Sequence, residues 1–104
     1  MNYDIRKIVY YQLVVHKYEL INMRNPKLSK IICNRIQQLQ VENNLNIEQL
    51  AYQSGISKGG LSEILRGMKE PSNSTIVKIC IALNISMQEF FDFDEIKKYM
   101  ENQF

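Results

Sequence analysis

Two short helical patterns separated by a tight turn, between Asn46 and Gly67, constrain the fold of this chain more than any other feature. The stretch reads NIEQLAYQSGISKGGLSEILRG. Ala51 is small enough to let two helix backbones approach each other, and Gly55 can adopt the positive φ that ends the first helix abruptly. Leu61 anchors the second helix to the core, so the opposite face of that helix stays free. Helical pairs of this kind insert their second helix into a DNA groove.

Helix-capping residues divide the surrounding sequence into a series of short helices. Apolar residues recur at three- and four-residue steps over 29–43, which predicts an amphipathic helix there, and Asn44 can end it in the left-handed conformation. The residues that can cap the next four helices share a short hydrogen-bonding side chain: Asn46, Ser57, Ser72 and Ser86. Asn46 with Gln49, and Ser86 with Glu89, have the spacing of a capping box. We therefore expect an all-α fold, a compact five-helix bundle over residues 28–91.

The segment before this bundle, residues 1–27, is predicted to be an N-terminal extension that serves as a dimerisation element. Its apolar residues suit an amphipathic helix, although the tyrosines and valines between positions 10 and 15 would also suit a β-strand. Asn25-Pro26 marks a break before the bundle, because a residue that precedes proline avoids the helical region.

The segment after the bundle, residues 92–104, is predicted to form a C-terminal amphipathic helix. Asp92 and Glu95 have the spacing of a third capping box at its start. Its apolar side chains fall on one side: Phe93, Ile96, Met100 and Phe104. A face of this kind needs a partner, which makes the segment a second candidate for dimerisation or for binding another protein.

Composition excludes several other classes of protein. The 104 residues carry a net charge of +2 and include two cysteines, Cys33 and Cys80, both within apolar helical patterns and without metal-ligand neighbours. We expect buried thiols and no metal or cofactor. The one histidine, His16, has no nucleophile or carboxylate in a recognisable relation to it, so an enzyme is not expected. With no transmembrane-length apolar run and no secretory signal, the chain is predicted to be cytoplasmic.

The region from about Ser29 to Phe91 resembles the phage Cro and repressor type of helix-turn-helix domain, the xenobiotic-response-element family of bacterial regulators. Six pieces carry the resemblance in order along the chain: RIQQLQ, LNIEQLA, SGIS, ILRG, EPSNSTIVKICIALNIS and MQEFF. The resemblance implies a five-helix domain that binds operator DNA, usually as a dimer, and therefore a transcriptional regulator. Ile47 departs from the family pattern, since the family usually has a glutamine there that can bind a phosphate or brace a base-reading side chain.

Matching the motif position by position predicts which residues contact DNA, with the predicted helix 58–66 in the major groove. Four residues should contact bases: Lys58, Gly59, Ser62 and Glu63. Four others should contact phosphates: Asn46, Ser57, Arg66 and Lys69. Lys58 is the leading candidate for direct readout because a cation can donate to guanine O6 and N7, a contact that contributes about 1 to 3 kcal/mol of discrimination.

The small positive charge predicts that one monomer binds DNA weakly. We expect a Kd on the order of 10⁻⁴ M for non-specific DNA at physiological salt. A homodimer on a double-stranded operator, with half-sites about 34 Å apart, would provide useful affinity and could act as a repressor.

A second hypothesis is a protein-interaction or antitoxin-like module in which DNA binding is weak or lost. Ile47 and the adjacent glycines Gly59 and Gly60 favour this hypothesis, since none of them can read a base through its side chain. Lys58, Arg66 and Lys69 oppose it.

Overall fold

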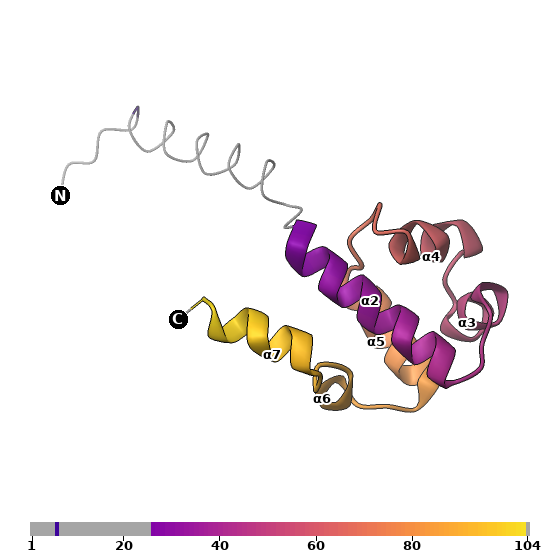
Figure 1. The fold of residues 1–104 in the computed structure, drawn as a ribbon. Helices are drawn as coiled ribbons and strands as arrows, with labels where there is room; N and C mark the ends of the chain where they lie inside the picture. Colours follow the sequence, from indigo (N-terminus) through magenta and orange to yellow (C-terminus); the bar gives the residue numbers. More distant parts are fainter. Residues whose placement is uncertain (1–5, 7–25, 104) are drawn as a thin grey trace.

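The computed structural model describes residue 6 and residues 26–103, and all regular structure within them is helical (Figure 1). The helices after the N-terminal segment are α2 (Pro26–Glu42), α3 (Ile47–Ser54), α4 (Lys58–Leu65), α5 (Asn73–Leu83), α6 (Met87–Phe90) and α7 (Asp94–Glu101). This confirms the predicted all-α fold, with five short helices in the bundle and one more after it. The predictions for residues 1–25 and for Phe104 lie almost entirely outside the described residues.

The first helix of the bundle begins three residues before the predicted Ser29. α2 starts at Pro26, a residue that suits the first helical position because its fixed φ is already helical and the missing N–H would have no partner there. At the other end Asn44 has a φ of 54°, so it takes the left-handed conformation predicted for it. The helix thus ends shortly before the cap of α3.

The predicted caps of the central helices are confirmed by hydrogen bonds. The Asn46 Oδ1 accepts from the Gln49 N–H at 2.8 Å, and the Asn46 N–H donates to the Gln49 Oε1 at 2.9 Å, which completes a capping box. Ser86 and Glu89 form the second box at the start of α6. Ser72 accepts from the Thr75 N–H at 3.1 Å and so caps α5.

The third capping box, predicted from Asp92 and Glu95, is wrong. The residue that precedes α7 is Phe93, and among residues 26–103 no side-chain capping hydrogen bond is formed at this end of the helix. Asp92 instead forms an ion pair with Lys97, and this hydrogen bond and the nearby positive charge lower the pKa of the Asp92 carboxyl. The carboxylate is drawn to an ammonium group rather than to the free N–H groups, so charge attraction overrides the local capping pattern.

One hydrophobic core joins the helices. Buried apolar side chains from α2, α3, α4, α5 and α6 form a single cluster that includes Ile36, Leu50, Leu61, Ile79 and Phe90, all fully buried. α3 packs against α4 and α5, and α2 packs against α4 and α7. Cys33 and Cys80 are buried as predicted and form no disulfide, and burial raises the pKa of the Cys80 thiol. The described helices include none of the length and apolarity needed to cross a membrane.

Arg35 helps to connect α6 and α7 to α2. From α2, Arg35 donates through Nε to the carbonyl of Phe90 and through Nη2 to the carbonyl of Glu89, both at 2.8 Å. Its guanidinium also lies 5.1 Å from the centre of the Phe93 ring, a cation–π distance. These bonds occupy carbonyls at the end of α6 and direct the chain into α7, which lies beside α2 (Figure 1). Ile96 of α7 is buried there, whereas Met100 stays exposed.

Candidate nucleic-acid interface

The turn between α3 and α4 has the geometry of a helix-turn-helix. Gly55 has a φ of 67°, which suits glycine, and its left-handed backbone lets the Ile56 N–H donate to the Ala51 carbonyl at 2.9 Å. Ala51 is buried, so the small side chain lets α3 and α4 approach each other. Ser57 then begins α4 by accepting from the Gly60 N–H at 3.1 Å. This turn fixes the orientation of α4 relative to α3 (Figure 1).

α4 has one buried face and one open face. Leu61 and Ile64 are buried, and Leu65 packs partly against the core. The four residues predicted to contact bases lie on the rest of the helix: Lys58, Gly59 and Glu63 are exposed, and Ser62 is half-buried. The fold therefore brings these candidates to one outward surface, with a rigid apolar attachment behind it.

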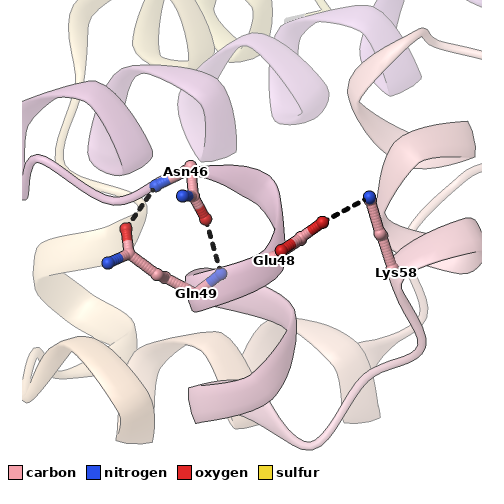
Figure 2. Close-up of polar contacts among 4 residues, drawn as sticks. All are labelled: Asn46, Glu48, Gln49 and Lys58. Carbon is pink, nitrogen blue, oxygen red and sulfur yellow. Dashed lines mark hydrogen bonds and ion pairs between the residues drawn. The ribbon is translucent and has the colours of Figure 1, made fainter.

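Lys58, the leading candidate for base readout, is engaged by a residue of α3. Its Nζ lies 2.6 Å from the Glu48 Oε1, as Figure 2 shows, and both side chains are largely exposed, at 64% and 69%. The hydrogen bond and the charge of Lys58 lower the pKa of the Glu48 carboxyl. Exposed ion pairs contribute little to folding stability, so the pair matters for the charge of this surface rather than for the fold.

The Glu48–Lys58 pair lies in an open groove between the starts of α3 and α4. Gln40, Asn46 and Ile47 complete the lining of this groove, which has a volume of about 440 Å³. Ile47, the residue that departs from the family pattern, is half-buried and packs against the core. Ile47 therefore has an apolar structural role, and the group that accepts a hydrogen bond from Lys58 belongs to the next residue of α3, Glu48.

The N-termini of α3 and α4 present the first pair of predicted phosphate contacts. The capping box already uses the Oδ1 and the backbone N–H of Asn46. Within residues 26–103 no hydrogen bond from the Asn46 Nδ2 is formed, so this amide group can donate to a phosphate. Ser57 accepts from Gly60 and keeps its hydroxyl proton as a donor. The N–H groups of Lys58 and Gly59 are in the first turn of α4, where backbone donors have no acceptor within the helix and favour anions.

The second pair of predicted phosphate contacts lies at the other end of α4. Arg66 is exposed and ends the helix, and its Nε donates to the Ser62 carbonyl at 3.4 Å. Gly67 follows with a φ of 72°, which turns the chain toward the exposed Lys69. Both cations thus lie at or beyond the C-terminal end of α4.

Sequence reasoning missed Glu48 as a member of this surface. Ten positions separate it from Lys58, a spacing that matches no periodicity within one helix. A signal was present, since Glu48 precedes the apolar Leu50 by two positions and so had to point away from the buried side of α3.

The two glycines at the start of α4 differ in what a side chain would contact. A Cβ added at Gly59 would have no heavy atom within 4 Å, so we expect Gly59→Ala to stabilise the protein by about 1 kcal/mol through helix propensity alone. A Cβ at Gly60 would lie 2.9 Å from the Ser57 Oγ, so Gly60→Ala should disturb the cap and gain less. Urea unfolding of both variants checks this, and equal gains would contradict the assignment of Ser57 as the working cap.

A bundle of short helices whose second motif helix has an anchored face and an open polar face defines the helix-turn-helix class. The model of the family HTH_3, helix-turn-helix, matches residues 36–90 of this chain, just over half of its length. The chain therefore belongs to the HTH_3 family, the Cro and repressor type predicted from its sequence, and is a DNA-binding helix-turn-helix protein.

Similar proteins agree with this family. The chain is 31% identical over 61 residues to the uncharacterised HTH-type transcriptional regulator YvzC of Bacillus subtilis, a match that covers 59% of this chain and 79% of YvzC. It is similar to the crystal structure of a point mutant of the restriction-modification controller protein C.Esp1396I, with 25% identity, a TM-score of 0.64, and coverage of 70% and 91%. For the clp gene regulator ClgR of Corynebacterium glutamicum the identity is 28%, the TM-score 0.60, and the coverage 73% and 79%.

Proposed function

We propose that this chain is a sequence-specific transcriptional regulator that acts as a repressor, with α4 inserted in the major groove of operator DNA. The observation that carries the proposal is the outward face of α4, where Lys58, Ser62 and Glu63 stand on a helix fixed from behind by Leu61 and Ile64. The names of YvzC and ClgR as regulators, and of C.Esp1396I as a controller protein, support the regulatory role.

Base readout in this proposal depends on a few polar and charged groups. Lys58 donates to guanine O6 and N7, and Glu63 can accept from the N4 of cytosine. Ser62 is half-buried, so its hydroxyl reaches only a base edge that comes close to the helix. Gly59 has no side chain and an open surface, which allows the backbone of α4 to approach the DNA closely.

Contacts to phosphates set the position of α4 without reading sequence. Asn46 and Ser57 offer a side-chain amide and a hydroxyl beside the first-turn N–H groups of α4, while Arg66 and Lys69 offer cations beyond its end. These groups lie before and after the base-reading residues, so they can hold one stretch of backbone on either side of the groove.

The charge of this surface favours a dimer. The exposed charges on and around α4 are three cations and two carboxylates, an excess of one positive charge: Lys58, Arg66 and Lys69 against Glu48 and Glu63. This excess is small, and non-specific affinity depends mainly on how many phosphates are neutralised. Two copies on half-sites about 34 Å apart would double the contacts and read a symmetric operator. A dimer that occupies a promoter would exclude other proteins from it, which is the basis for proposing repression.

Two observations favour a second candidate function, in which this chain binds DNA only weakly and acts mainly through a protein partner. The ion pair with Glu48 occupies the residue most suited to reading a base, and Ile47 packs against the core where it cannot bind a phosphate. Under this alternative the exposed surface of α3 and α4 contacts a protein partner.

Selection from a library of random DNA duplexes tests the proposed function. The protein should enrich a symmetric sequence with two half-sites about 34 Å apart, and the affinity for that duplex should fall steeply between about 50 and 200 mM salt. Sedimentation of the complex should show two copies per duplex. If no sequence is enriched, or if binding does not depend on salt, the regulator proposal is wrong and the interaction module is favoured.

A further inference from the structure

We propose that Glu48 is a specificity-determining residue, which positions the Lys58 ammonium for guanine and cancels its attraction to phosphates. The inference rests on the proposed function, because Glu48 has this role only if α4 enters the major groove. It adds a residue of α3 to the base-reading set and explains how a surface with so few cations can favour one sequence.

The geometry places the carboxylate where it can position Lys58. Glu48 is in the first turn of α3 and Lys58 is the first residue of α4, so their 2.6 Å contact bridges the starts of the two motif helices (Figure 2). The Asn46–Gln49 capping box fixes the backbone on one side of this contact. The Ser57 cap fixes it on the other. The long, flexible side chain of Lys58 is thereby held in one preferred orientation across the groove between the starts of α3 and α4.

The hydrogen-bond capacity of Lys58 matches a guanine once Glu48 is bound. An ammonium group has three N–H donors and no acceptor, and Glu48 takes one of them. The two that remain equal the two acceptors, N7 and O6, that a guanine presents in the major groove. An adenine would place a donor, its N6 amino group, against the same ammonium. Lys58 can therefore bind guanine in preference to adenine while its ion pair with Glu48 stays in place.

Charge compensation acts on non-specific binding. DNA phosphates attract any exposed cation, whatever the sequence, and each neutralised phosphate releases counterions. A glutamate is ionised at neutral pH and the hydrogen bond from Lys58 lowers the pKa of Glu48 further, so the opposite charges of the pair cancel when seen from the DNA backbone. The pair as a whole then adds little to binding at a wrong sequence, so the difference between right and wrong sequences increases.

The test is Glu48→Gln, which keeps the size and a hydrogen-bond acceptor but removes the charge. The probes are the duplex that the wild-type protein enriches and a scrambled duplex of equal composition. We expect the variant to bind the scrambled duplex about eightfold more tightly at 0.1 M salt, the effect of one further counterion released. The slope of log affinity against log salt should steepen by about 0.9, and the preference for the enriched duplex should fall.

Two controls isolate the role of Glu48. Glu101→Gln changes the net charge equally, but Glu101 is exposed on α7, which packs against α2, so both affinities should stay at their wild-type values. In a Lys58→Ala background, Glu48→Gln should no longer steepen the salt slope by this amount, since the released cation is absent.

Two results would overturn the proposal. One is a Glu48→Gln protein that binds both duplexes as the wild type does. The other is an equal gain with and without Lys58, which would mean that the carboxylate only repels DNA. Failure of the wild-type protein to enrich any duplex would instead remove the proposed function itself, and that result appears before any variant is made.

Discussion

Leu61→Ala is expected to lower the free energy of unfolding by about 2 to 5 kcal/mol, a large part of the roughly 5 to 15 kcal/mol that stabilises a domain of this kind. Leu61 is 0% exposed and belongs to the core cluster that joins the helices of the bundle. Removing its side chain loses buried apolar area and leaves a cavity that the surrounding helices fill only in part. The urea midpoint, followed by far-UV circular dichroism, should fall without a change in slope.

Ile81→Ala is the matched control for this substitution. Ile81 is also a large aliphatic residue on a helix, but it is 75% exposed on α5, so its truncation should change stability by no more than about 0.5 kcal/mol. Leu61→Ala should also weaken binding to specific DNA, because α4 loses its central anchor even in molecules that remain folded. Equal stability of the two variants would show that α4 does not depend on the core for its position.

The parts of the fold that sequence predicts well are those set by local chemistry. The caps at Asn46, Ser57 and Ser72 form within three residues, so the side chain and its backbone partner are close before any tertiary contact exists. The left-handed ends at Asn44 and Gly55 are equally local. The buried faces follow from spacing alone, since three- and four-residue steps place side chains on one side of a helix.

The parts that sequence does not predict depend on residues that the fold brings together. Arg35 donates a hydrogen bond to the carbonyl of Phe90, 55 positions away, and no local sequence pattern near either residue predicts this contact. Lys58 was predicted to contact a base, and its side chain is exposed, but its ion-pair partner Glu48 belongs to another helix. The failed capping box at Asp92 shows the same limit, because a local pattern was outcompeted by an ion pair with Lys97.

Lys58→Ala is expected to abolish sequence preference at one base pair of each half-site. The lost contact corresponds to about 1 to 3 kcal/mol, or about 5- to 150-fold in affinity for the enriched duplex. Beyond a uniform loss caused by the unpaired Glu48 carboxylate, the loss should be confined to guanine-containing versions of that base pair, because only there do two acceptors face the ammonium. Fluorescence titration against a panel of single-base variants of the enriched duplex measures this preference.

Replacing single guanines of the enriched duplex by 7-deazaguanine locates the contact in the DNA. The modified base lacks the N7 acceptor but keeps its pairing, so one position should weaken binding by the wild-type protein and leave Lys58→Ala unchanged. The same experiment with Glu48→Gln should retain part of the effect, since the lysine is still present but less well oriented.

Arg66→Ala provides the contrast that separates reading from positioning. Arg66 is exposed at the end of α4, where a cation meets phosphates rather than base edges, so its loss should weaken all duplexes alike and reduce the salt slope by about 1. Lys58→Ala also leaves the Glu48 carboxylate unpaired, which should weaken all duplexes to a common extent, but it should in addition remove the preference at one base pair. If both substitutions weakened every sequence equally, Lys58 would be a phosphate contact, and base recognition by α4 would have to depend on Ser62 and Glu63.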